Sequence, residues 1–209
     1  MPTRNVPISV ATGISYNAAE IWPGAQALVD VLRPACERIE IAGSLRRRTA
    51  LVHDIEIVAM PRLGRDLFGD LAVDAPTELD AILARLVRQD RLCRGDKGRS
   101  RYKNFRVSVT DQPRITLDLF VVLPPAQWGV LFLIRTGPAE FSHWVVTQQL
   151  AGGALPSHCR VLDGAVREGL IGEGKIVPMP EEIDFLEFLG LGWIEPAERV
   201  ARWTQWEQG

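Results

Sequence analysis

Two acidic residues separated by a single isoleucine, in the β-prone run His53–Val58, constrain the fold of this chain more than any other feature. Successive side chains on a strand point to opposite faces, so Asp54 and Glu56 project from one face, about 6.6 Å apart along the backbone. Ile55 and Ile57 then point the other way, into a core. Two carboxylates on an open face suit a hard divalent cation, because Mg²⁺ prefers oxygen ligands in near-octahedral geometry. The run therefore predicts a half-open strand with a candidate metal site.

A third acidic residue, Asp118, lies in a second β-prone run over 114–123. By alternation it points away from the leucines on either side of it. An acid in so apolar a strand is costly to bury alone, so it lies on an open face or beside a cation. Next to Asp54 and Glu56 it would complete a group of three carboxylates for two metal ions about 3.5–4 Å apart. Such a group suits phosphoryl transfer.

A glycine-serine turn precedes these strands. Gly43-Ser44 opens onto a basic segment that contains Arg46 and Arg47, and a short helix is expected to begin at Ser44. Such a turn can hold a phosphate group. The turn and the carboxylates together indicate nucleotide chemistry.

Charge is unevenly distributed along the chain. The net charge of −2 over 209 residues gives no indication of nucleic-acid binding. Between Arg85 and Arg106, however, nine basic residues stand against two acidic ones. One interpretation is a solvated helix and loop; the other is a contact with a nucleic-acid backbone. The candidates for that contact are Arg85, Arg88, Arg91, Arg94, Lys97, Arg99, Arg101 and Lys103.

Other features bear on the cellular compartment. The cysteines at 36, 93 and 159 lack the CxxC spacing of a zinc site and are odd in number, which argues against a disulfide framework and favours a reducing cytosol. The N-terminus has no signal pattern, and charged, proline and glutamine residues interrupt the most apolar window, 117–134, which excludes a membrane span there. We expect a cytoplasmic monomer of bacterial or phage origin.

The predicted elements are those of an α+β protein. Apolar spacing and cap residues predict helices over 18–36, 74–90, 126–135, 138–150 and 180–189. The predicted strands cover 38–42, 53–60, 101–109 and 114–123, with a hairpin turn at 111–113 and a second hairpin around Asp163-Gly164. The pattern changes after Pro124-Pro125, so we expect a first unit over 1–124 and a second over 125–209. The first would hold a mixed sheet flanked by helices, and the second would be a smaller α+β unit.

In this order, the motifs resemble those of the nucleotidyltransferase superfamily, and more narrowly those of the family X DNA polymerases, the group of DNA polymerase beta. The matching motifs are Gly43-Ser44, Arg46-Arg47, His53–Ile57 and Leu117-Asp118-Leu119. The segment 135–141 is similar to that family's aromatic-Thr-Gly-Ser segment, and 180–199 is similar to its closing thumb segment. The resemblance covers roughly residues 20–200 and implies a truncated palm-and-thumb form, without an N-terminal lyase domain or DNA clamps.

This resemblance implies an activity and its partners. The expected enzyme is a DNA polymerase of gap-filling or repair type that adds nucleotides to a primer 3′-hydroxyl and releases pyrophosphate. Its cofactor would be two Mg²⁺ ions, with Mn²⁺ as an alternative. Its partners would be a nucleoside triphosphate and a DNA primer-template or gapped DNA.

The resemblance also assigns roles. Asp54 and Glu56 would ligate both metals, and Asp118 would bind the catalytic metal and accept the 3′-hydroxyl proton. The turn would hold the β- and γ-phosphates, and Arg47 would pair with the triphosphate. The implied nucleotide-binding set is Gly43, Ser44, Arg47, Arg135, Thr136 and Gly137.

The chain departs from the family at the metal site and the sugar pocket. Glu56 replaces the usual aspartate and could shift metal preference toward Mn²⁺. Arg135 replaces a residue that is often aromatic beside the incoming sugar.

Two other functions stay open. A nucleotidyltransferase acting on RNA, a protein or a small molecule is supported by the absent clamps and the altered sugar pocket. The second alternative is a non-catalytic DNA-binding module on a retained polymerase scaffold. The three acids argue against it, because a binding module has no need to hold mutually repelling carboxylates together.

Overall fold

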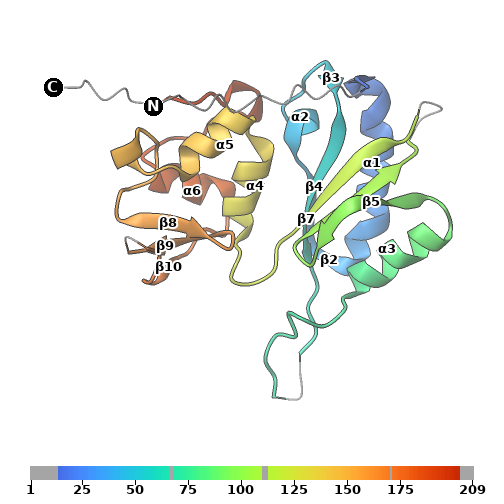
Figure 1. Ribbon diagram of the computed structural model, residues 1–209, viewed down its shortest axis with the longest axis horizontal. Coiled ribbons are helices and arrows are strands. Elements are labelled where there is room, and N and C mark those ends of the chain that lie inside the picture. Colours follow the sequence, from blue (N-terminus) through green and yellow to red (C-terminus); the bar gives the residue numbers. More distant parts are fainter. Residues whose placement is uncertain (1–13, 66–67, 110–112, 170, 203–209) are drawn as a thin grey trace, which may run out of the picture.

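The computed structural model describes residues 14–65, 68–109, 113–169 and 171–202. These residues form an α+β fold with a five-stranded mixed sheet flanked by helices, next to a smaller unit of helices and a three-stranded sheet (Figure 1). The predicted α+β class, with its mixed sheet, is therefore confirmed. In Figure 1 the sheet-bearing unit is coloured blue to green, and the smaller unit yellow to red.

The first unit is built around its sheet. Its helices are α1 (Ala18–Leu32), α2 (Gly43–Arg46) and α3 (Glu78–Arg88), with a 3₁₀ turn at Arg33–Ala35. The strands of the sheet, in spatial order, are β2 (Cys36–Ile41), β4 (Asp54–Pro61), β7 (Ile115–Val121), β6 (Tyr102–Val107) and β5 (Leu92–Arg99). The neighbours β4 and β7 run parallel and the other pairs antiparallel. A separate short pair joins β1 (Tyr16–Asn17) to β3 (Leu51–Val52).

The second unit is smaller. Its helices are α4 (Trp128–Thr136), α5 (Ala139–Val146) and α6 (Glu182–Phe188), with 3₁₀ turns at Gln149–Ala151 and Pro196–Glu198. Its sheet consists of β10 (Ile176–Val177), β9 (Ala165–Glu168) and β8 (Cys159–Leu162). The predicted hairpin around Asp163-Gly164 is confirmed, since β8 pairs with β9 across these two residues.

Several segments differ from prediction. Helix α1 ends at Leu32 rather than near residue 36, and α5 ends at Val146 rather than at residue 150. Helix α3 starts at Glu78 rather than at residue 74, because Thr77 and Asp80 form a capping box that ends the preceding loop. Strand β5 was not predicted, since its sequence is basic, contains two glycines and lacks apolar alternation. Its pairing with β6 makes it a strand. The expected hairpin of β6 and β7 is present, but residues 111 and 112 of its turn lie outside the described residues.

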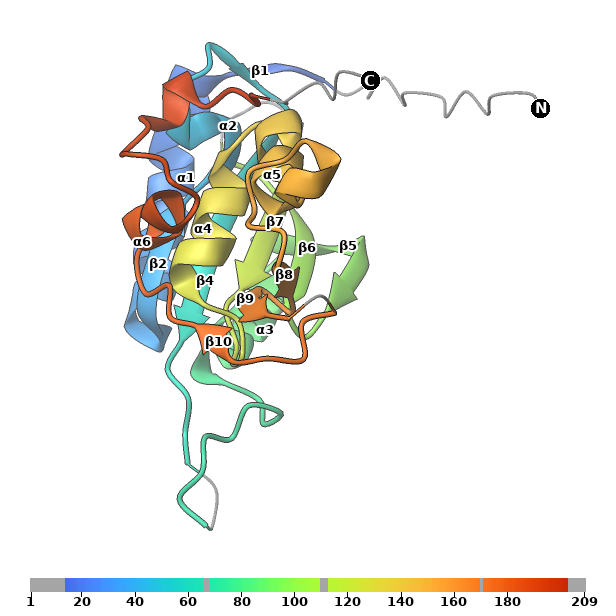
Figure 2. The same ribbon diagram turned by 90° about the vertical axis from the view of Figure 1, so that its left-hand side faces the viewer.

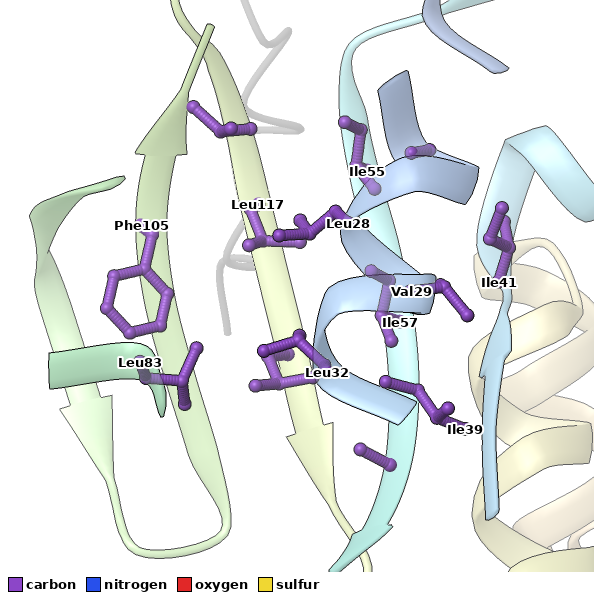
Figure 3. Close-up of a cluster of buried hydrophobic side chains, with 14 of the residues drawn as sticks. Leu28, Val29, Leu32, Ile39, Ile41, Ile55, Ile57, Leu83, Phe105 and Leu117 are labelled. Atoms are coloured by element: carbon purple, nitrogen blue, oxygen red, sulfur yellow. The ribbon is translucent and has the colours of Figure 1, made fainter. Parts of the chain in front are cut away.

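One face of the five-stranded sheet is covered by α1 and α3. The apolar residues of β4 and β7 that alternate with the acids point to these helices and are almost completely buried. Figure 3 shows this core, with labelled side chains Leu28, Val29, Leu32, Ile39, Ile41, Ile55, Ile57, Leu83, Phe105 and Leu117. The alternation predicted for both strands is confirmed.

The opposite face of the sheet is only partly covered. In Figure 2, where the second unit faces the viewer, α4 lies in front of β4. A small apolar cluster joins the two there, made of Ala42, Val58, Phe120, Val122, Trp128 and Phe132. The main core of the first unit reaches Leu123 and that of the second starts at Val130, on either side of the boundary expected near residue 124.

The helices of the described residues are all too short or too polar to cross a lipid bilayer.

Candidate active site

The register of β4 and β7 brings the acids together. Glu56 lies opposite Asp118 in this parallel pair, and Asp54 lies opposite Thr116. All three acids point away from the core under α1 and α3, and all are partly buried. Because paired strands lie about 4.8 Å apart, Glu56 and Asp118 leave the sheet side by side. The expected adjacency of the two acidic strands is present for Glu56 and Asp118.

The carboxylates suit a divalent cation by their chemistry, since Mg²⁺ and Mn²⁺ take oxygen ligands. Over the described ranges, however, no three His, Cys, Asp or Glu side chains converge into a ready-formed metal cluster. The donor set therefore fits the expected metal, whereas the side-chain positions do not by themselves form its coordination shell. The metal roles of Asp54, Glu56 and Asp118 stay predictions.

The electrostatics around Asp54 and Glu56 favour a bound cation. Burial raises the pKa of Glu56 to about 7, and the charge of Asp54 acts in the same direction. Arg47 and Arg135 act against that shift. Burial also raises the pKa of Asp54, with the charge of Asp118 adding to it. A divalent cation would relieve both shifts, because positive charge stabilises ionised carboxylates.

The Gly43-Ser44 turn lies directly against Glu56. Gly43 has a φ of +60°, a conformation that favours glycine. A Cβ atom at Gly43 would lie 1.9 Å from Oε2 of Glu56, and the backbone N–H of Ala42 donates to the Glu56 carbonyl at 2.8 Å. The turn expected to hold phosphate is therefore next to the carboxylates expected to hold metal.

Replacing Gly43 with alanine should move the Glu56 carboxylate and weaken the metal binding predicted for it. The left-handed backbone should also cost about 1–2 kcal/mol of stability. Gly190→Ala is the matched control, because Gly190 has a φ of +74° with nothing within 4 Å of an added Cβ. Both variants should lose stability in thermal unfolding, but only Gly43→Ala should bind Mn²⁺ more weakly in a paramagnetic-resonance titration. Equal Mn²⁺ affinity in the two variants would contradict this reading of the turn.

The two arginines after the turn reach toward the second unit. Arg47 Nη1 donates to the Thr136 carbonyl at 2.6 Å, and Arg46 Nη1 donates to Thr136 Oγ1 at 2.7 Å. Burial lowers the pKa of Arg47, while Glu56 and Asp54 raise it. Since a guanidinium carries five N–H donors, this single bond leaves Arg47 donors for a phosphate.

Thr136 and Gly137 serve packing in this structure. Thr136 is completely buried. A Cβ at Gly137 would lie 2.5 Å from Cδ1 of Phe141, so glycine allows α5 to approach the end of α4. Their expected contribution to a sugar and base pocket stays a prediction.

A cavity of about 520 Å³ adjoins the acids, between the open face of the sheet and the second unit. Glu56, Asp118, Tyr102, Arg101 and Arg135 contribute to its lining. With Asp163, which also lines it, the cavity combines three acidic with two basic side chains, as a site for a metal-bound anion would.

Arg135 is held over an aromatic ring in this cavity. Its guanidinium carbon lies 4.0 Å from the ring centroid of Phe120. Burial lowers the pKa of Arg135, while Glu56, Tyr102 and Asp118 raise it. Its Nε is buried without a hydrogen-bond partner among the described residues. Arg135 thus offers a partly desolvated cation beside the acids.

The basic run 85–106 is divided between the two faces of the sheet. Arg85 and Arg88 are exposed on α3, which packs on the face opposite the acids. Arg91 is exposed just after α3. Lys97 and Arg99 belong to β5 by their backbone, but their side chains lie outside the described residues.

The remaining basic candidates are partly engaged with other groups. Lys103 pairs with Asp80 of α3 at 2.7 Å. Arg94 and Lys103 line a second cavity, of about 750 Å³, between α3 and strands β5 and β6. Arg101 lines the cavity beside the acids and donates to the Pro124 carbonyl at 2.7 Å. The nucleic-acid-binding role of these residues stays a prediction.

Two residues at this site were not identified from the sequence. Tyr102 Oη donates to Asp118 Oδ1 at 2.7 Å, and Asn104 Nδ2 donates to the same oxygen at 2.6 Å. Burial and the hydrogen bond to Asp118 raise the pKa of Tyr102 to about 12, so the phenol stays protonated and donates. The only signal in the sequence was their separation by two positions in the strand predicted over 101–109, which places both side chains on one face.

Comparison with protein-family models finds no match to this chain, and comparison with curated proteins finds none either. The geometry of the site and the motifs are therefore what indicates a function.

A buried ionic network, also missed from the sequence, joins the two units near the site. Glu182 of α6 accepts from Arg46 at 2.8 Å and from Arg199 at 2.6 Å. Burial alone would raise the pKa of Glu182, but these two arginines outweigh it and lower the pKa. The network connects the Gly43-Ser44 turn and α2 to the second unit.

Proposed function

We propose that this protein is a nucleotidyltransferase of the family X DNA polymerase type, built as a palm and a thumb. It would add nucleotides to a primer 3′-hydroxyl, in gap filling or repair, and release pyrophosphate. The observation that carries the proposal is the register that sets Asp118 opposite Glu56 on an open sheet face. The Gly43-Ser44 turn against Glu56 is further support.

Each part of the site has a role in this reaction. Asp54, Glu56 and Asp118 would hold Mg²⁺ or Mn²⁺. When bound, the metal supplies positive charge that activates a hydroxyl and stabilises a leaving pyrophosphate. Asp118 would accept the proton of the primer hydroxyl.

The nucleotide would be bound by the turn and the cavity. Backbone N–H groups of Gly43 and Ser44 would bind phosphate oxygens, and Arg47 would bind them through its remaining donors. Arg135 would meet the nucleotide from the opposite side, in the cavity where it stacks on Phe120.

A second candidate is a nucleotidyltransferase that modifies RNA, a protein or a small molecule. The observation in its favour is the position of α3. Arg85 and Arg88 lie on the face opposite the acids, and Lys103 is paired with Asp80. This part of the basic surface would therefore not guide DNA to the acids.

Primer extension tests both candidates. The protein would be incubated with nicked, gapped and single-stranded DNA, with deoxy- or ribonucleotides, and with Mg²⁺ or Mn²⁺. We expect metal-dependent extension on gapped DNA. In parallel, labelled nucleotides and a cell extract would reveal a label in RNA or protein, which would favour the second candidate. DNA binding with no turnover in either assay, and no effect of metal on thermal stability, would instead indicate a non-catalytic DNA-binding module.

A further inference from the structure

We propose that Tyr102 and Asn104 are positioning residues that orient the Asp118 carboxylate by occupying one of its two oxygens. The role that this inference gives to Asp118 rests on the proposed function. Neither residue belongs to the motifs on which the proposal of function depends.

Both donors converge on one atom. Tyr102 Oη and Asn104 Nδ2 lie 2.7 Å and 2.6 Å from Asp118 Oδ1. These distances are typical of hydrogen bonds to an ionised acceptor, which are roughly twice as strong as neutral ones. Within the described ranges, no protein donor bonds the other oxygen, Oδ2. The carboxylate is thus fixed through Oδ1 and presents Oδ2 for a ligand or a proton.

The sheet imposes this arrangement through the pairing of β6 with β7. Asn104 lies directly opposite Asp118, and Tyr102 lies opposite Phe120. Residues in such positions have Cβ atoms about 4.5–5.5 Å apart, within reach of a short amide side chain. Tyr102 is two residues from Asn104 along β6, so its longer side chain spans the diagonal distance to Asp118.

Further contacts restrict both donors. The ring of Tyr102 stacks on Phe120, with centroids 5.3 Å apart and an interplanar angle of 28°. On the other side, a Cβ at Gly95 of β5 would lie 1.7 Å from Oδ1 of Asn104, so the backbone of β5 closes over the amide. The donors therefore have little freedom to turn away from Asp118.

Such an arrangement has a chemical consequence. Partners that orient a metal-binding or proton-accepting carboxylate typically contribute 10–100-fold to metal affinity or activity. The contribution arises because the carboxylate need not be ordered again at each turnover. We therefore expect the chemical step, rather than nucleotide binding, to depend on Tyr102 and Asn104.

The test uses two nearly isosteric variants and a matched control. Tyr102→Phe removes only the hydroxyl, and Asn104→Leu removes the donor while keeping a similar volume. Tyr16→Phe makes the same chemical change at a hydroxyl that donates to the Pro113 carbonyl at 3.2 Å, away from the acids. Full-length proteins would be compared by steady-state primer extension and by Mn²⁺ titration followed by paramagnetic resonance.

We expect kcat to fall about 10–100-fold in Tyr102→Phe and in Asn104→Leu, with nucleotide KM changed less than about threefold and Mn²⁺ bound more weakly. Tyr16→Phe should keep the wild-type kcat and Mn²⁺ affinity. Wild-type kcat and Mn²⁺ affinity in both site variants would overturn the inference, and so would equal losses in Tyr16→Phe. If the wild-type protein shows no turnover, the proposed function fails, and the Mn²⁺ titration alone decides the positioning role.

Discussion

Replacing Asp118 with asparagine should reduce nucleotidyl transfer by about 10³-fold while leaving the fold intact. The amide has the same shape, and its oxygen can still accept from Tyr102 and Asn104, which hold Oδ1 in the wild-type protein. It carries no negative charge for a divalent cation and cannot accept the proton of an attacking hydroxyl. Loss of activity with retained structure would therefore identify Asp118 as a catalytic residue.

Stability should separate this loss from misfolding. The charge of Asp118 contributes to the raised pKa of Asp54, so its removal relieves repulsion at the site. The melting temperature of Asp118→Asn should equal or exceed that of the wild-type protein. Activity would be measured as labelled-nucleotide incorporation and stability by circular dichroism.

Asp30→Asn is the matched control for this experiment. Asp30 lies on α1, on the opposite side of the sheet, and its side chain is 61% exposed. This variant should keep wild-type activity. Incorporation by Asp118→Asn above a tenth of the wild-type rate would contradict the proposed mechanism.

Replacing Glu182 with glutamine should produce the largest loss of stability. Arg199 has a completely buried side chain, and Arg46 is 21% exposed, so both depend on the Glu182 carboxylate for charge compensation. Removing one partner of a buried ion pair typically costs 3–5 kcal/mol, because the other charge stays buried without compensation. For a chain of this size, the melting temperature should fall by about 10 °C.

The neighbouring acid provides the control. Glu181 pairs with Arg38 at 2.7 Å, but both side chains are largely exposed, at 53% and 36%. Glu181→Gln should therefore cost less than about 1 kcal/mol. Urea unfolding of both variants would measure the difference, and equal losses would contradict the importance of the buried network.

The pH dependence of this loss follows from the pKa of Glu182. Because the folded-state pKa lies below the ordinary value, the ionised carboxylate stabilises the fold at pH values above that ordinary value. This contribution is lost as the pH falls through the folded-state pKa. The difference in stability between the wild-type protein and Glu182→Gln should therefore shrink in acid.

Some parts of the fold could be predicted because their signals are local. The alternation around Asp54, Glu56 and Asp118 identifies which side chains share a face, since a strand repeats every two residues. Apolar spacing located the helices to within a few residues, and Asp163-Gly164 located a hairpin. Each of these signals arises from residues that are close together in the sequence.

Other parts depended on contacts between distant segments. Strand β5 has no apolar alternation of its own and becomes a strand by pairing with β6. The basic run is continuous in the sequence, yet the packing of α3 placed Arg85 and Arg88 on the face opposite the acids. The register that gives Asp118 its donors Tyr102 and Asn104 is likewise set by strand pairing.

The sequence by itself determined which residues point outward from each strand, and therefore which acids could serve a site. Only the tertiary structure decided what lies beside them, including the register of Glu56 with Asp118 and the ionic network of Glu182. The physical reason is that the direction of a side chain on a strand follows from local backbone geometry. The register of the strands and the partners of each side chain depend instead on how the whole core packs.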